Sequence, residues 1–441
     1  MERKRVLSVA ILAPLACLLC LVVYNLPPVH DRLGWRVDEI VLRIRYTLNP
    51  PQKAVFVPQE GLTATARAEL PGPTPTGLPT HTPTATSEPA STTAPAATLP
   101  PETTPTITPT PLPERVELSG VRYQDQHGRY NYCAPANLAM ALSFWGWDGN
   151  QDTVGPVIKP DQKDRNVMPY EMVDYVETHT DLRAVERVGG DLDTIRRFLA
   201  AGYPVLVERG VYLHDLTGVV SWMGHYQVIT GYDQAEGYFI AQDSFIQPDH
   251  QVLNDELLQN WRAFNYTYLV IYPPENEAEV LALLGVDADE TANYQNAALK
   301  ASNEIYGLSG IDQYFAWYNR GTNLMRLQDY AGASVAYDEA FALYPTIPEA
   351  ERPWRMLWYQ TGPYFAYFYA QRYWDVLYLA DGTLNAMQGE RNLEESYYWR
   401  AMAKAALGDT QGATQDFLTS LEYHEGFEPS IYQLSLLGVT P

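Results

Sequence analysis

Cys133 is the residue whose setting most clearly indicates chemistry. It opens the stretch 133–145, in which Leu138, Leu142 and Trp145 recur at helical spacing, as in an amphipathic helix. Unpaired backbone N–H groups and the helix dipole stabilise negative charge at a helix N-terminus. They lower the pKa of a thiol there and raise its thiolate fraction, which is the nucleophilic form. The placement predicts a reactive cysteine, and the alternative is an inert buried thiol.

A histidine and an aspartate follow in a second block. The segments 224–233 (GHYQVITGYD) and 238–243 (YFIAQD) read as two strands joined by a turn. His225 at the start of one strand and Asp243 at the end of the next can be neighbours in an antiparallel pair. The imidazole can then take the thiol proton while the carboxylate fixes its tautomer. Without these partners, His225 would more commonly be structural.

Gln126 lies seven residues before Cys133. A carboxamide there can donate a hydrogen bond to the oxyanion that forms when a thiolate attacks a carbonyl, alongside the Cys133 N–H. Gln124 is a rival for the same role.

Together these motifs resemble the papain-like cysteine peptidases, and most closely the peptidases that remove double-glycine leaders from bacteriocins. That family shows a glutamine, then Cys-Gly-Pro-Ala at a helix start, then Gly-His-(Tyr/Phe)-x-Val-x-x-Gly-Tyr, then Asp-Pro ending a strand. This chain has Gln126, CAPA at 133–136, GHYQVITGY at 224–232 and Asp243-Ser244. The resemblance covers about a third of the chain.

The resemblance implies an α+β papain-like fold and peptide-bond hydrolysis through an acyl-enzyme, without a cofactor. By position, Cys133 is the nucleophile, His225 the general base and acid, Asp243 its orienting group and Gln126 the oxyanion donor. Two residues depart from the pattern: Ala134 replaces a glycine and Ser244 a proline. Neither change removes an atom that the chemistry needs.

Leader removal itself is not the expected role. Leader peptidases of that kind are cytoplasmic and fused to an ATP-driven exporter, whereas this chain has no Gly-x-x-x-x-Gly-Lys-(Ser/Thr) phosphate-binding loop. A surface or cell-envelope substrate fits better.

Other polar residues indicate no second site. His179, His214 and His250 lack metal-like spacing, so no metal site is expected. Asp191 and Asp193 read as helix-start residues.

The elements that must position these residues fall within 115–274, the predicted peptidase domain. Helices are predicted at 133–145, 169–178 and 191–201, and most strand candidates follow them. This order predicts an α+β domain. The strand candidates are 183–188, 203–208, 225–232, 238–242 and 266–272.

Residues 288–437 are predicted to form an all-α domain that resembles tetratricopeptide repeats. One 34-residue unit is clear, a second begins near residue 394, and the stretch 364–383 reads as a degenerate unit between them. The matching residues of the first unit are Trp317, Gly321, Leu324, Ala333, Tyr337, Ala340 and Pro345. Such repeats present concave faces, so we expect them to bind a peptide or protein.

The N-terminal part predicts membrane attachment. Residues 6–26 form 21 uncharged, mostly apolar positions after the basic 2–5 segment, which favours a retained anchor with a cytoplasmic N-terminus over a cleaved signal peptide. Residues 27–60 form a juxtamembrane segment whose apolar stripe suits either a helix on the membrane surface or a packing element. The segment 61–114 is a predicted disordered linker or stalk, since 27 of the 43 residues from 71 to 113 are proline or threonine.

Composition limits the partners. The net charge of −23 argues against nucleic acid, whose phosphates require basic surfaces.

Taken together, these patterns predict a bacterial, single-pass membrane protein with an extracytoplasmic cysteine peptidase domain acting on a peptide or protein. The alternatives are a catalytically silent papain-like module in a scaffold or adhesion protein, and another thiol acyl transfer such as amidase, isopeptidase or transglutaminase-like activity.

Overall fold

The computed structural model describes residues 111–161, 164–214, 220–387, 389 and 391–440, together with residues 40, 41, 44, 47, 48 and 55–58. The predicted anchor at 6–26 lies outside the described residues, as do most of the segments 27–60 and 61–114. Ile40, Ile44 and Leu48 of the predicted juxtamembrane stripe are helical with exposed side chains. Within the described part of the chain, no helix has the length and apolar character to span a membrane.

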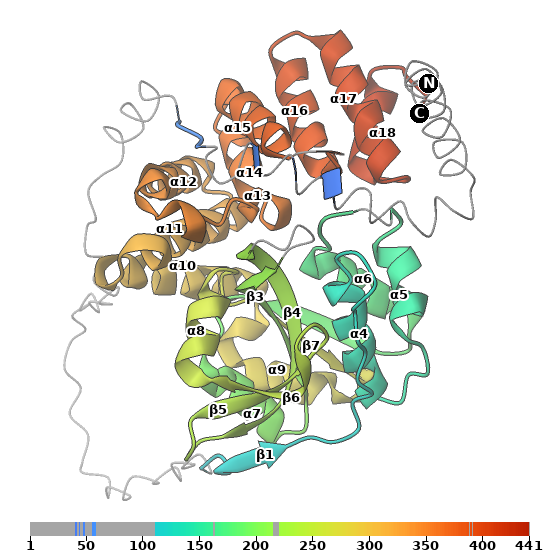
Figure 1. Cartoon of the computed structure of the whole chain (residues 1–441), viewed down its shortest axis with the longest axis vertical. Coiled ribbons are helices and arrows are strands. Elements are labelled where there is room, and N and C mark those ends of the chain that lie inside the picture. Colours follow the sequence, from blue (N-terminus) through green and yellow to red (C-terminus); the bar gives the residue numbers. More distant parts are fainter. Residues whose placement is uncertain are drawn as a thin grey trace, which may run out of the picture.

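A seven-stranded antiparallel sheet forms the centre of the first domain (Figure 1). The strands lie in the order β2-β7-β3-β4-β5-β6, and β1 pairs with the end of β4. The β3–β4 hairpin is the longest pairing, running from Val205 opposite Ile229 to His214 opposite Val220. The strands are β1 (Arg115–Glu117), β2 (Arg183–Arg187), β3 (Val205–His214), β4 (Val220–Asp233), β5 (Tyr238–Asp243), β6 (Gln247–Leu253) and β7 (Tyr268–Tyr272).

Helices cover both faces of this sheet because successive strand residues point to opposite sides. Leu206 and Val228 belong to a core beneath one helix group, whereas Val207 and Ile229 belong to the core beneath the other. The first group is α4 (Cys133–Phe144), α5 (Gln151–Ile158) and α6 (Pro169–His179). The second is α7 (Leu192–Ala200), α8 (Asn254–Arg262) and α9 (Glu277–Leu284).

The predicted α+β class is confirmed: α4, α6 and α7 occupy the three predicted helical stretches, and β2, β3, β4, β5 and β7 occupy the predicted strands. One detail was wrong. Helix α4 is not amphipathic, because Ala139 and Met140 are as fully buried as Leu138 and Leu142. It packs against β4 on one side and α5 on another, so no face remains for water.

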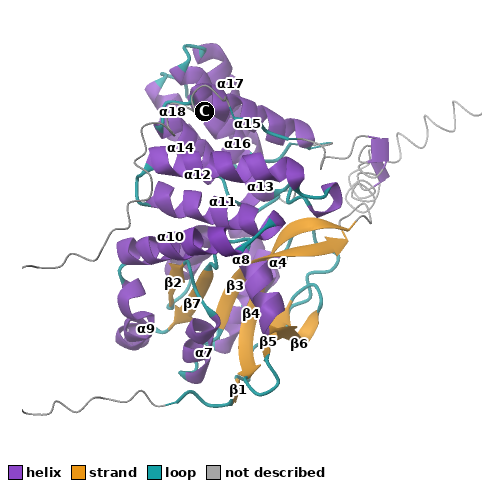
Figure 2. Ribbon diagram, turned by 90° about the vertical axis from the view of Figure 1, so that its left-hand side faces the viewer, coloured by secondary structure: helices purple, strands orange, loops and turns teal. Residues whose placement is uncertain are grey.

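After β7 the described chain is helical. Figure 2 shows these helices stacked as layers against one end of the α+β domain. The helices are α10 (Glu290–Gly307), α11 (Gly310–Arg326), α12 (Tyr330–Leu343), α13 (Met356–Tyr359), α14 (Gly362–Tyr369), α15 (Tyr373–Ala386), α16 (Glu394–Ala406), α17 (Thr410–Tyr423) and α18 (Glu428–Leu436). Short 3₁₀ turns lie at Pro274–Asn276, Gly285–Ala288, Tyr344–Thr346 and Glu349–Glu351.

Three helical hairpins correspond to the three predicted repeat units: α11–α12, α14–α15 and α16–α17. Their turns share a residue in the left-handed region, at Gln328 (φ 64°), Gln371 (φ 60°) and Gly408 (φ 89°). In the first hairpin, a Cβ added at Gly321 would lie 2.8 Å from the Tyr337 ring, so glycine allows the two helices to approach closely.

The α+β domain and the helical region share one hydrophobic cluster. Trp222 of β4 stacks on Phe264 at a centroid distance of 5.7 Å and on Phe315 of α11 at 6.0 Å. Tyr318 and Tyr337 belong to the same cluster and are fully buried. The contact between the two parts is therefore continuous core, not a polar linker.

Candidate active site

Cys133 is the first residue of α4 and carries a free, half-buried thiol. Tyr132 precedes it without a side-chain cap, and Pro135 in the first turn has no N–H. The first backbone hydrogen bond of the helix runs from Ala136 N to Tyr132 O at 3.1 Å. The N–H groups before Ala136 therefore have no partner within the helix and can face an anion beside the sulfur.

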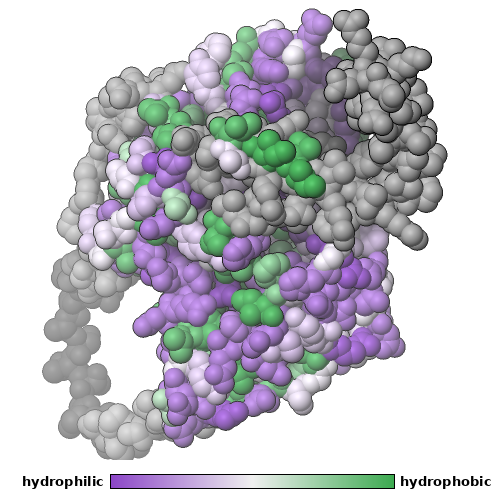
Figure 3. Space-filling view, viewed as in Figure 1, coloured by the Kyte–Doolittle hydropathy of each residue, from purple (hydrophilic) through white to green (hydrophobic). Residues whose placement is uncertain are grey.

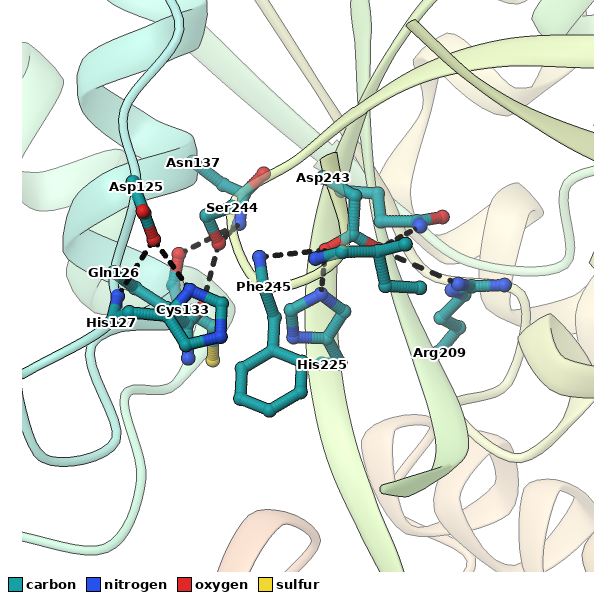
Figure 4. A network of polar contacts seen from close by, with 12 residues as sticks. Asp125, Gln126, His127, Cys133, Asn137, Arg209, His225, Asp243, Ser244 and Phe245 are labelled. Carbon is teal, nitrogen blue, oxygen red and sulfur yellow. Dashed lines mark hydrogen bonds and ion pairs between the residues drawn. The ribbon is translucent and has the colours of Figure 1, made fainter. Parts of the chain in front are cut away.

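His225 and Asp243 form a buried pair on adjacent strands. The His225 Nε2 and Asp243 Oδ1 atoms are 2.8 Å apart, and the two residues are 2% and 0% exposed. In Figure 4 the second ring nitrogen of His225 lies on the side toward Cys133. The carboxylate thus fixes Nε2 as the protonated nitrogen and leaves Nδ1 for the thiol.

This environment sets the proton affinity of His225. Burial alone would lower its pKa, but the charge and hydrogen bond of Asp243, together with the neighbouring Cys133 thiol, raise the pKa to about 9. At neutral pH the ring is therefore mainly imidazolium. That form can stabilise a thiolate and can donate a proton to a leaving amine.

Asp243 is held by more than the histidine. Its Oδ1 also accepts hydrogen bonds from the backbone N–H groups of Phe245 (2.8 Å) and Ile246 (2.9 Å), and its Oδ2 accepts from Gln227 Nε2 (Figure 4). Burial would raise the pKa of Asp243, but His225 and these donors lower it well below its usual range. The carboxylate is thus fixed in position and ionised.

Arg209 lies behind this pair. It is directly opposite His225 in the β3–β4 ladder, 1% exposed, and its Nη2 is 3.6 Å from Asp243 Oδ2. Its Nη1 is 3.4 Å from Glu256 Oε1. Two carboxylates therefore accompany one buried guanidinium, which compensates the charge of Asp243 from the side away from the thiol.

Gln126 is oriented by Ser244 and Asn137. Ser244 Oγ donates to Gln126 Oε1 at 2.7 Å and accepts from Asn137 Nδ2 at 2.8 Å. Asn137 Nδ2 also donates to Cys133 O at 2.9 Å, so the network ends at the first turn of α4. Because the Gln126 amide oxygen accepts this bond from Ser244, the Gln126 NH₂ group is left to donate a hydrogen bond in the pocket.

These contacts account for both departures from the family motif. Ser244, in place of proline, supplies the hydroxyl that holds Gln126. Ala134, in place of glycine, lies within α4, where alanine is the most favourable residue. Both residues are buried in their local packing.

A cavity of about 130 Å³ joins these residues. Cys133, His225 and Gln126 line it, whereas Asp243 lies behind the histidine and Gln124 is absent from its walls. Residues from both parts of the chain complete the walls: Glu208 from β3, Phe245 after β5, the loop residues Arg165, Asn166 and Val167, and Arg355, Trp358 and Tyr359 from the helical region.

Sequence reasoning missed the residues that hold the site: Arg209, Gln227, Ser244 as a hydrogen-bonding residue, Asn137 and the wall from α13. Spacing could have indicated two of them, because Asn137 lies one helical turn after Cys133 and Gln227 shares a strand face with His225. Arg209 and Arg355 carry no sequence signal, since only the tertiary fold brings them to the site.

Of the remaining polar candidates, Asp191, His179 and His250 lie away from the Cys133 pocket. Asp191 caps α7, where its side chain accepts from Thr194 N at 2.6 Å, as predicted. His179 stacks on Tyr175 at the end of α6, and His250 lies in β6. His214 is among the residues that line the Cys133 pocket.

Parts of the chain are similar to known proteins. Residues 118–269 match the Peptidase_C39 like family, and residues 314–347 match the tetratricopeptide repeat. A crystal structure of a C39-like peptidase from Bacillus anthracis is similar, with 17% sequence identity and a TM-score of 0.30, covering 36% of this chain and 96% of that chain. No curated protein matches the chain.

Proposed function

Because the chain carries a C39-like peptidase domain followed by a helical region with a tetratricopeptide repeat, we propose that it is a membrane-anchored, extracytoplasmic cysteine peptidase. It hydrolyses peptide bonds through an acyl-enzyme on Cys133, and the helical region binds substrate or a protein partner. The observation that carries the proposal is the buried His225–Asp243 pair, whose imidazole shares a pocket with a helix-terminal thiol and a carboxamide.

Acylation follows from these positions. The Cys133 thiolate attacks the peptide carbonyl carbon, and the carbonyl oxygen becomes an oxyanion that the Cys133 N–H and the Gln126 NH₂ stabilise. His225 then gives its proton to the leaving nitrogen as the C–N bond breaks. The amine product leaves, and the acyl group remains as a thioester on the sulfur.

Deacylation uses the same residues in the reverse sense. Neutral His225 takes a proton from water, and the hydroxide attacks the thioester carbonyl through the same oxyanion site. The C–S bond breaks, which releases the acid product and restores the thiolate–imidazolium pair. Asp243 keeps the imidazole oriented through both steps.

The location of the activity rests on the sequence. The uncharged segment 6–26 would hold the chain in the membrane, and the basic residues before it favour a cytoplasmic N-terminus. The Pro/Thr-rich segment 61–114 would then carry the peptidase domain outside the membrane. Figure 3 shows mainly hydrophilic residues over the visible face of the α+β domain, as contact with water requires.

Digestion of a peptide library by the full chain tests the proposal. We expect cleavage at a restricted set of sequences by the wild type, and none by Cys133→Ala. His225→Ala removes the proposed general base. Its matched control is His179→Ala, because His179 is an exposed histidine outside the pocket. Identical products from wild type and Cys133→Ala would contradict a thiol mechanism, and intact peptides with both would favour a silent binding module.

A further inference from the structure

A second cluster of titratable side chains lies where the helical region meets the α+β domain. Asp164 is in the loop between α5 and α6, Glu394 is the first residue of α16, and His424 follows α17. One carboxylate oxygen or ring nitrogen from each lies within 4.8 Å of the other two. Figure 1 shows α5 and α6 on the side of the domain that faces the α16–α18 end of the helical region.

One pair of these atoms has the spacing of two ligands on a shared cation. The His424 Nδ1 and Glu394 Oε1 atoms are 3.0 Å apart. Two ligands at about 2.1 Å from one metal ion lie roughly 3.0–3.4 Å apart in octahedral or tetrahedral geometry. Asp164 and Glu394 are each 4% exposed, so a cation there would be largely shielded from water.

The cluster carries an excess of buried acid. The carboxylates that act on one another here are Asp161, Asp164, Glu171, Glu394 and Glu395. The Lys159 ammonium acts against Asp161 and Asp164. A bound divalent cation would offset the mutual repulsion of the clustered carboxylates.

Two amide oxygens provide an independent observation. Asn166 and Asn392 are 6% and 2% exposed, and in the described structure their Oδ1 atoms have no hydrogen-bond partner. Both amide groups border the cluster, since Asn166 Nδ2 donates to Glu395 Oε1 and Asn392 Nδ2 to Asp161 Oδ2, each at 3.3 Å. A buried carbonyl oxygen without a donor is costly unless a cation or water meets it.

We propose that Asp164, Glu394 and His424 bind a divalent transition-metal cation, with the amide oxygens of Asn166 and Asn392 completing its surroundings. The donor set selects the ion. An imidazole nitrogen suits Zn²⁺ or Mn²⁺ and is a poor ligand for Ca²⁺, while two carboxylates balance the charge of a divalent ion.

Such an ion would link the loop that forms one wall of the catalytic pocket to the helical region. Asp164 directly precedes Arg165, Asn166 and Val167, which line the cavity with Cys133. Glu394 and His424 belong to the last predicted repeat unit. The ion therefore has a structural role and takes no part in the thiol chemistry.

Equilibrium dialysis of the untagged, metal-stripped full chain tests the site. The Cys133→Ala variant is used beside the wild type, because a thiolate next to an imidazole can itself bind Zn²⁺. We expect both proteins to take up about one Zn²⁺ or Mn²⁺ per chain, with release of protons and a raised unfolding temperature, and Ca²⁺ to bind at least tenfold more weakly. Absence of Zn²⁺ and Mn²⁺ uptake by Cys133→Ala would overturn the proposal.

Variants assign the ligands. In the Cys133→Ala background, His424→Gln and Asp164→Asn are expected to weaken uptake at least tenfold and to remove the metal-dependent temperature shift. The matched controls His179→Gln and Asp174→Asn alter exposed residues of α6 and should bind as the parent does. Glu394→Gln provides a third ligand variant should either of the first two fail to fold. Unchanged affinity in a folded ligand variant would contradict the site, whatever the peptidase assay shows.

Discussion

His225 owes its high proton affinity to its contact with Asp243 on the neighbouring strand. Burial opposes the imidazolium, so the carboxylate must more than offset desolvation to raise the histidine pKa to about 9. The same contact gives stability a pH dependence. Because the folded pKa exceeds the unfolded value of about 6.5, this stabilisation is complete below that value and is lost as pH rises through about 9.

We expect kcat/KM of the wild type to fall as pH rises through about 9, because His225 then loses the proton that the leaving amine needs. Asp243→Asn should shift this fall to lower pH, since the Cys133 contact would then be left to oppose the effect of burial on the imidazole. The measurement is kcat/KM against pH. Asp255→Asn, which alters an exposed carboxylate of α8, should keep the wild-type profile. A wild-type profile in Asp243→Asn would contradict the assigned role.

Gln126→Ala should lower kcat about 10²–10³-fold with little change in KM, because an oxyanion donor acts mainly in the transition state. Gln124→Ala is the matched control, as Gln124 is absent from the pocket walls, and it should retain nearly full activity. Equal kcat values for the two variants would remove Gln126 from the mechanism.

At this scale, the sequence predicted candidate reactive groups but not the groups that hold them. Cys133, His225 and Gln126 were predicted from their types, order and neighbours. Arg209 contacts Asp243 only because β3 pairs with β4 in one register. The role of Ser244 likewise depends on the fold, which brings it to Gln126 although the two residues are 118 positions apart.

Among the elements, strong local patterns were predicted well and weak ones were missed. Strand β6 has the polar sequence QPDHQVL because it is the exposed edge of the sheet, so it lacks the apolar alternation of an interior strand. Helix α5 contains Gly155 and Pro156, which discourage a helix prediction, yet Asn150 caps it and accepts from Asp152 N and Thr153 N. The similarity of the three hairpin turns is visible only in the structure, where each turn has a residue in the left-handed region.

Gly321→Ala should destabilise the helical region by about 1–3 kcal/mol, because the new methyl group would meet the Tyr337 ring at 2.8 Å within a filled core. Gly382→Ala is the matched control within α15. Its added Cβ would meet nothing within 4 Å, so we expect a gain of about 0.5–1 kcal/mol from helix propensity. Denaturant unfolding followed by circular dichroism measures both. An unchanged free energy of unfolding in Gly321→Ala would show that α11 and α12 are less closely packed than described.

At the scale of the whole molecule, the peptidase domain and the helical region form one packed unit. Sequence patterns predicted two domains, because the strand signals end near residue 274. They could not predict that Trp222 and Phe264 would share a core with α11, since the sequence does not indicate which residues an aromatic side chain will contact. The pocket wall from α13 follows from that shared core.

Arg355→Ala should raise KM about tenfold with a smaller effect on kcat, because Arg355 fastens α13 to β4 and thereby shapes the pocket. Its Nη1 donates to Ser221 Oγ and, at 2.9 Å, to Trp222 O. Arg352→Ala is the control, since the Arg352 contacts with Ile347 O and Pro345 O stay within the helical region. Steady-state kinetics separate the two variants, and an unchanged KM in Arg355→Ala would mean that α13 does not shape substrate binding.

The most direct measurement is the rate at which a thiol-directed alkylator modifies Cys133, followed by peptide mass mapping to distinguish it from Cys17 and Cys20. The wild type should react rapidly at neutral pH, because the imidazolium of His225 stabilises the thiolate. His225→Ala should react markedly more slowly at the same pH, because the variant lacks this positive charge. Equal rates in the two proteins would contradict the thiolate–imidazolium pair.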